Sequence, residues 1–136
     1  NMKLRLLLSI FLLTIAQVLT AQDSLKTTYP LVISFQSECC GVPSQTSLRN
    51  FITTFKKKYK IKKITANHIG PMGREGEYYL AFGLKELSKK RAKEFIAKIK
   101  LIKKLPADKG LFSFNEKMEI DAATFSQRTK SKKEDF

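Results

Sequence analysis

Residues 29–36 read Tyr29-Pro30-Leu31-Val32-Ile33-Ser34-Phe35-Gln36, and this stretch decides the fold. Apolar side chains at Leu31, Ile33 and Phe35 alternate there with the polar side chains of Ser34 and Gln36. A period of two residues is typical of a β-strand with one buried face and one exposed face. The stretch therefore predicts a first strand whose apolar side packs on a core.

Two later stretches have the apolar spacing of amphipathic helices. The first begins at Ser44 or Ser47, and the second follows Ser88, a residue type preferred at helix N-caps. Pro106 and Gly110 end the second stretch. The predicted buried stripes are Leu48, Phe51, Ile52, Phe55 and Tyr59 in the first helix and Ala92, Phe95, Ile96, Ile99 and Ile102 in the second.

Alternation predicts three more strands, within residues 61–69, 78–84 and 112–120, with a glycine-rich turn at residues 70–76. The resulting order β-α-β-β-α-β is that of the ferredoxin-like fold. We therefore expect an α+β sandwich with two helices on one face of a four-stranded antiparallel sheet. The opposite sheet face is polar enough to be exposed or to contact a partner, and it carries Ser34, Gln36, Thr65, Asn67 and Tyr79.

The N-terminus has the three parts of a secretory signal peptide, which we assign to residues 1–21. Lys3 and Arg5 precede an apolar run that is too short for a membrane span, and small residues precede Gln22. Residues 22–28 are expected to form a polar leader and residues 29–122 the ferredoxin-like domain. Residues 123–136 are charged, lack periodicity and are expected to be disordered. The sequence thus predicts a secreted or periplasmic protein.

The chain has 26 Lys and Arg residues against 12 Asp and Glu residues, a formal net charge of +14. Such a charge favours an anionic surface or an acidic protein as partner. The expected export disfavours nucleic acid. The candidate anion-binding residues are Lys57, Lys93 and Lys100, on or next to the predicted helices, together with Arg74 in the glycine-rich turn.

Cys39 and Cys40 are the only cysteines, and they are adjacent. Four interpretations are open: a strained vicinal disulfide, disulfides between chains, a soft-metal site, or one cysteine packed as a small apolar side chain. Thiolates near a helix N-terminus have a lowered pKa. His68 and Met72 are expected at the same sheet edge, where they could help the two thiols bind Cu(I) or another soft ion.

The layout of residues 29–120, in which a strand leads through a cysteine-bearing loop into a helix, resembles heavy-metal-associated domains of the copper-chaperone type. The diagnostic motif of that family is Met-x-Cys-x-x-Cys, whereas this chain has Ser37-Glu38-Cys39-Cys40-Gly41. The resemblance implies that Cys39 and Cys40 are ligands of Cu(I) or a similar soft ion.

No pattern of an enzyme is present in the sequence. His68 is the single histidine, and the acidic residues Glu75, Glu77 and Glu86 form no convincing catalytic pair. We therefore expect a small, exported, non-enzymatic binding module with a basic helical face. The alternative is a soft-metal or thiol-redox module centred on Cys39 and Cys40. A third possibility, by analogy of fold alone, is a secreted inhibitor or pro-segment-like module.

Overall fold

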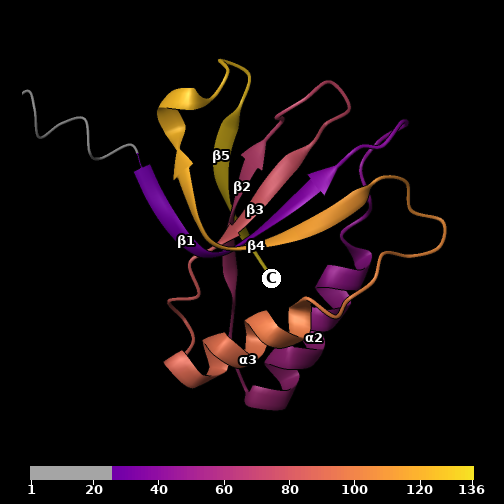
Figure 1. Cartoon of the computed structure of the whole chain (residues 1–136). Helices are drawn as coiled ribbons and strands as arrows, with labels where there is room; N and C mark the ends of the chain where they lie inside the picture. The colour runs from indigo at the N-terminus through magenta and orange to yellow at the C-terminus, as the bar shows by residue number, and fades with distance from the viewer. Residues whose placement is uncertain (1–25) are drawn as a thin grey trace, which may run out of the picture.

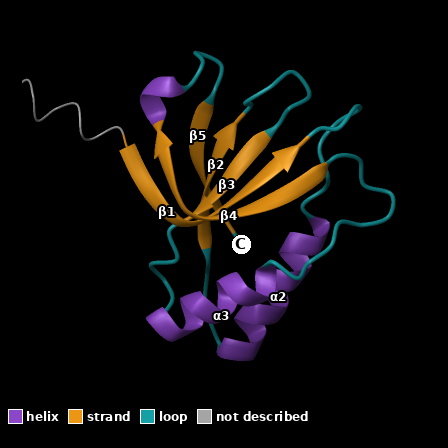
Figure 2. Cartoon of the chain, viewed as in Figure 1, coloured by secondary structure: helices purple, strands orange, loops and turns teal. Residues whose placement is uncertain are grey.

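The structure, a computed structural model, describes residues 26–136. The predicted signal peptide lies outside the described residues. Figure 2 shows one sheet with two main helices. The elements are β1 (Lys26–Gln36), α2 (Thr46–Tyr59), β2 (Thr65–Gly70), β3 (Tyr78–Phe82), α3 (Lys89–Ile99), β4 (Leu111–Asp121), the 3-10 helix η2 (Ala122–Thr124) and β5 (Lys130–Asp135).

The sheet has five strands in the order β4-β1-β3-β2-β5. Every neighbouring pair is antiparallel. Figure 1 shows α2 and α3 together on one side of the sheet. The α+β arrangement is therefore present, but the predicted four-stranded ferredoxin-like sheet is wrong, because a fifth strand extends the sheet beyond β2.

The fifth strand comes from the segment that the sequence predicts to be disordered, and that prediction is wrong as well. Residues 130–135 pair with β2 along its whole length, from Gly70 opposite Lys130 to Thr65 opposite Asp135. Phe136 extends the pairing, because its N–H donates to the carbonyl of Ile64 at 3.0 Å. This segment is ordered because its backbone groups pair with the edge of β2, although its charged side chains give no sign of a strand.

The observed domain boundaries also differ from the predicted ones. β1 begins at Lys26, within the predicted leader, and its first residues pair with the end of β4, as in Lys26 opposite Asp121. The domain also continues beyond residue 122 to the C-terminus, which lies between the sheet and the helices in Figure 1.

The main core lies between the sheet and the two helices. The predicted strand face of Leu31, Ile33 and Phe35 is buried there, together with Phe55 and Phe95 from the helix stripes. The ring of Phe95 is fully buried and lies 5.2 to 5.8 Å, centroid to centroid, from three other phenylalanine rings. The helical stripes read from the sequence thus do face the core.

A second, smaller apolar cluster lies on the opposite face of the sheet, where the sequence predicts a polar surface. Val32, Ile69, Ala81 and Ile120 are buried in it, and Phe125, which follows η2, packs against it. Ser34 is likewise only 3% exposed. The chain between β4 and β5 therefore covers part of the face that we expect to be open.

The strand β4 changes faces along its length. Phe112 and Phe114 pack on the main core, whereas Met118 and Ile120 pack on the second cluster, although all four positions have the same parity. Lys117 lies between them with a left-handed φ of 52°. This backbone conformation breaks the simple alternation, so a single apolar face could not be read from the sequence.

The N-cap of α2 is Gln45, which makes no side-chain cap hydrogen bond, so the predicted start at Ser44 or Ser47 is wrong. The end of α2 and the start of α3 do follow local rules. The Ser88 hydroxyl accepts a hydrogen bond from the Arg91 N–H at 3.4 Å, as expected of an N-cap. Three lysines occupy the last turn of α2, where the helix dipole favours cations. Within residues 26–136 no helix has both the length and the apolar character needed to cross a membrane.

The Phe95→Ala substitution should destabilise the domain by about 3–5 kcal/mol, because it removes a fully buried ring and leaves a cavity. Chemical denaturation monitored by circular dichroism measures this loss. The control Leu101→Ala should change the stability little, since Leu101 is 77% exposed. Equal effects of the two substitutions would mean that α3 does not pack as described.

Burial of the Tyr78 phenol raises its pKa to about 12 from an ordinary value of 10. Because the folded state holds this proton more tightly than the unfolded state, stability falls as the pH rises from about 10 to about 12. We expect Tyr78→Phe to move alkaline unfolding to higher pH. The control is Tyr79→Phe, which changes a tyrosine on the opposite face of β3. An equal shift for both variants would contradict the assignment to Tyr78.

Candidate functional site

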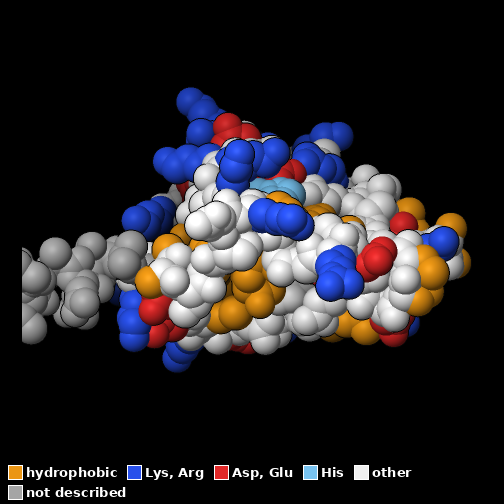
Figure 3. All heavy atoms as spheres, turned by 90° about the horizontal axis from the view of Figure 1, so that it is seen from above, with side chains coloured by type: hydrophobic (Ala, Val, Ile, Leu, Met, Phe, Trp, Pro, Cys, Tyr) orange, Lys and Arg blue, Asp and Glu red, His pale blue; other side chains and the backbone are white. Residues whose placement is uncertain are grey.

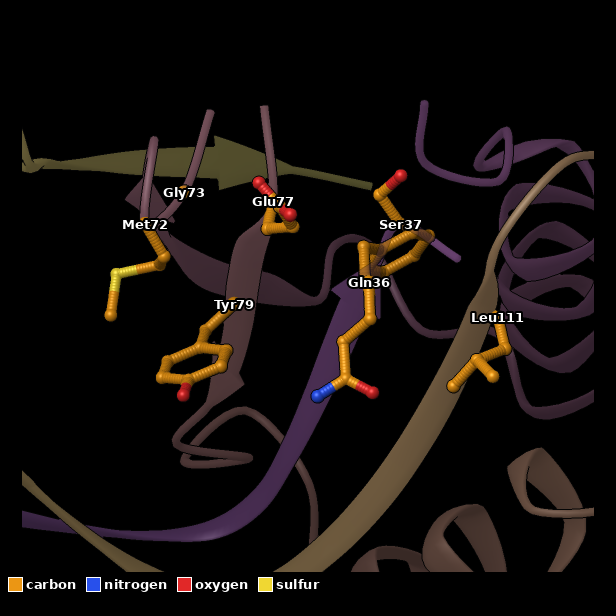
Figure 4. Close-up of a pocket in the computed structure, with 8 residues that line it drawn as sticks. Gln36, Ser37, Met72, Gly73, Glu77, Tyr79 and Leu111 are labelled. Atoms are coloured by element: carbon orange, nitrogen blue, oxygen red, sulfur yellow. The ribbon is translucent and has the colours of Figure 1, made fainter. Parts of the chain in front are cut away.

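The loop after β1 and the turn between β2 and β3 meet at one edge of the sheet. Because β3 is antiparallel to both β1 and β2, those two strands run in the same direction and end at the same edge, as the sequence predicts. A cleft of about 360 Å³ opens there. Figure 4 shows its lining, which consists of Phe35, Gln36, Ser37, Met72, Gly73, Glu77, Tyr79 and Leu111.

The cleft has mixed chemistry. Figure 4 shows Met72 and Leu111 at its opposite sides, with the Tyr79 ring and the Gln36 amide between them. The Glu77 carboxylate is engaged by the backbone, because its Oε2 accepts from the Glu75 N–H at 3.1 Å. The lining contains the polar side chains of Ser37, Glu77 and Tyr79 but no cysteine or histidine. The cleft thus offers both apolar and polar contacts.

Cys39 and Cys40 lie in the loop after β1, and both are exposed free thiols. The hydrogen bond with Cys40 raises the pKa of Cys39, and the negative charges of Glu38 and Glu75 raise it further. The sequence predicts a lowered pKa from the nearby helix N-terminus, and for Cys39 that prediction is wrong. A raised pKa reduces the thiolate fraction, which is the form that attacks electrophiles and binds metals.

The four predicted soft-metal ligands are not assembled at one place. Met72 lines the cleft of Figure 4, whereas His68 lies in a different hollow, on the helix side of the sheet. Nowhere in residues 26–136 do three His, Cys, Asp or Glu side chains gather in a way that could hold a metal ion. Binding of Cu(I) or another soft ion by the cysteine pair stays a prediction, without His68 as a partner.

The glycine-rich turn is filled by a carboxylate. A Cβ atom at Gly73 would lie only 2.2 Å from Glu77 Oε2, so this side chain packs directly on the turn. The turn therefore offers a negative charge where an anion cradle would need hydrogen-bond donors. Arg74 lies in the same turn, and it forms no ion pair with any described residue.

The predicted helical cations differ in how they are paired. Lys57 on α2 and Lys93 on α3 are exposed and form no ion pair with the described acids. Lys100 is paired with Glu116 of β4, so its charge is compensated locally. Arg91 and Lys98 both contact Glu94. The helices thus carry a weaker uncompensated charge than their lysine count suggests.

A further group of cations lies on β5, where no site was predicted from the sequence. Lys130, Lys132 and Lys133 are exposed and have no acidic partner in the described part of the chain. Figure 3 shows Lys and Arg side chains gathered around the single histidine on this face of the molecule. The clue available from the sequence was the density of lysines near the C-terminus, which the prediction of disorder set aside.

Because side chains alternate along a strand, β5 presents cations to both faces of the sheet. Lys130 and Lys132 line a hollow of about 380 Å³ on the helix side, together with His68 and Tyr78. Lys133 lines a groove of about 700 Å³ on the opposite side. Lys63 and Lys85 line the same groove. One edge strand therefore supplies positive charge to two concave surfaces.

Comparison of the chain with protein-family models, curated proteins and solved structures finds no match. The predicted resemblance to heavy-metal-associated domains is thus neither confirmed nor contradicted. Side-chain geometry and charge are therefore the basis for inferring a function.

The Cys40→Ala substitution should speed alkylation of Cys39 at neutral pH, because it removes the hydrogen bond that contributes most to the raised pKa. The rate of reaction with iodoacetamide, followed by intact mass, measures this change. The control is Cys40→Ser, which also has a single thiol but whose hydroxyl can still form a hydrogen bond with Cys39. Equal or slower alkylation of the alanine variant would contradict the role of this hydrogen bond. Glu75→Gln should also speed the reaction, by a smaller factor.

Proposed function

We propose that this chain is a non-enzymatic binding module that docks through its cationic surface on an acidic polysaccharide or another anionic surface. The observation that carries the proposal is the edge strand β5, with three exposed lysines at Lys130, Lys132 and Lys133 and no acidic partner for them in the described residues. Lys57 and Lys93 add uncompensated charge from the helices. This extends the basic surface predicted from the helices alone.

The acids of the domain do little to reduce this charge. Several of them are already held by cations, as in Glu94, which contacts both Arg91 and Lys98. Hydrogen bonds from Lys98 and Tyr59 lower the pKa of Glu94 to about 2, so it stays ionised and paired. The unpaired lysines are then free to interact with an external anion.

Lysine ammonium groups are compact, hydrated point charges without the planar fork of arginine. A surface built from them attracts polyanions by charge and gives little stereochemical discrimination. The proposed interaction is accordingly sensitive to salt. Export by the predicted signal peptide is part of the proposal, and it favours polysaccharides and lipid headgroups over nucleic acid as the anion.

The alternative functions have less support in the geometry. The raised pKa of Cys39 lowers the thiolate fraction of that residue, and the thiolate is the form that exchanges disulfides and binds metals. His68, which the soft-metal hypothesis needs, bonds instead to Glu134 of β5. A role as inhibitor or pro-segment has no specific contact in its favour within residues 26–136.

Heparin, a sulfated polysaccharide, should bind the protein at low salt, and the affinity should fall steeply as the Debye length shrinks from about 30 Å at 0.01 M to about 8 Å at 0.15 M. The double variant Lys132→Glu/Lys133→Glu should weaken this binding more than Lys57→Glu/Lys93→Glu, because β5 concentrates its charges on one short strand. Heparin-affinity elution and fluorescence anisotropy measure these effects.

Lys93→Ala and Lys100→Ala form a matched pair for this test. Both remove one lysine on or next to α3, but the Lys100 charge is already compensated by Glu116. Lys93→Ala should therefore weaken heparin binding more than Lys100→Ala. Wild-type protein that fails to bind heparin even at 0.01 M salt would overturn the proposed function.

A further inference from the structure

The hollow between β2, β5 and the β2–β3 turn has the parts of a small anion site. Its volume is about 380 Å³, within the range of small-molecule sites. Lys130 and Lys132 approach it from β5, and His68 and Tyr78 approach it from β2 and β3. Gly70, Pro71 and Gly76 line its turn side.

His68 is held rigidly at this hollow by two contacts. Its Nδ1 lies 3.0 Å from a carboxylate oxygen of Glu134, and its ring stacks on the Tyr78 ring at a centroid distance of 4.3 Å. A carboxylate only accepts hydrogen bonds, so Nδ1 carries the hydrogen of this contact. Nε2 is the other ring nitrogen. It can donate to an oxyanion only when the ring is protonated, because Nε2 of the neutral ring is an acceptor.

The charge balance of the hollow is positive. Glu134 contacts His68 at the hollow, and the same carboxylate also pairs with the Arg49 guanidinium of α2. This cation offsets the Glu134 charge. Lys130 and Lys132 have no acidic partner among the described residues, and they directly oppose Gly70 and His68 in the strand register. Two uncompensated ammonium groups therefore flank the imidazole.

We propose that this hollow binds a tetrahedral oxyanion, as free phosphate or sulfate or as the ester group of a sugar, with Lys130 and Lys132 as the charge partners and His68 as the positioned ring. The inference rests on the proposed function and deepens it, because it assigns one specific subsite within the cationic surface. The hollow has room for one sugar unit attached to the anion. The helical lysines, in contrast, contribute attraction without a defined pocket.

The single histidine of the chain makes the test direct, since one set of imidazole signals reports on the hollow. Inorganic phosphate, inorganic sulfate and a sulfated disaccharide are titrated separately into the full domain at fixed pH, with chloride keeping the ionic strength constant. The ring ¹H–¹⁵N signals of His68 should shift and saturate with phosphate or sulfate. A stronger response to the disaccharide identifies a sugar ester as the source of the anion, and an equal response identifies the free ion.

The double variant Lys130→Ala/Lys132→Ala should raise the dissociation constant for phosphate about tenfold or more, as expected for the loss of hydrogen bonds to a charged group. The control Lys103→Ala/Lys109→Ala removes the same charge from the loop before β4, the strand at the opposite edge of the sheet. It should leave the His68 response unchanged. Circular dichroism checks that both variants fold. If Lys130→Ala/Lys132→Ala does not fold, the milder variant Lys132→Gln replaces it.

The hollow and the proposed function can fail separately. If wild-type protein binds heparin but phosphate and sulfate move the His68 signals no more than chloride does, the proposed subsite is wrong and the polyanion function stands. An equal loss of phosphate affinity in both double variants would likewise overturn the subsite. If the His68 signals saturate with phosphate but heparin does not bind, the subsite stands and the polyanion function is wrong.

Discussion

The burial of strand β1 on both faces constrains the whole domain. Leu31 and Val32 are both fully buried, although they point to opposite sides of the sheet. Leu31 belongs to the main core under the helices, and Val32 belongs to the second cluster. A strand of this kind needs a neighbour on each edge and cover on each face. The antiparallel partners β3 and β4, the two helices and the segment around Phe125 meet these requirements.

The second constraint is the attachment of β5, a charged strand that is held by contacts with residues distant in the sequence. Glu134 contacts Arg49 of α2 and His68 of β2, so a single carboxylate links three elements. Phe136 adds an apolar contact, because its ring lies 5.8 Å from that of Phe82 and 4.7 Å from the Arg49 guanidinium. These contacts fix the lysines of β5 beside His68, so the shape of the candidate anion site follows from the way this strand is held.

These two constraints explain what could be predicted from the sequence. The helices and the first strand have local apolar periodicity, and buried residues of the helices such as Phe55 and Phe95 were identified correctly. In the first strand the face of Leu31, Ile33 and Phe35 was also correct, but the burial of Val32 and Ser34 on the other face was missed. β5 reads Lys130-Ser131-Lys132-Lys133-Glu134-Asp135 and has no apolar alternation. Its order comes from backbone pairing with β2 and from side-chain partners 66 and 85 positions away in the chain. No local pattern encodes such partners, so the five-stranded sheet and its cationic edge were missed.

Lysines on an exposed edge strand also hinder pairing with the edge of a second molecule. That role explains why β5 is charged, but it does not explain the position of the charges. Protection of an edge needs no concave surface, no histidine and no compensation of the neighbouring acid. Here Lys130 and Lys132 line a hollow, His68 is fixed at its wall, and Arg49 offsets the charge of Glu134. Because edge protection predicts none of these three features, the anion-binding interpretation accounts for more of the observed geometry than edge protection does.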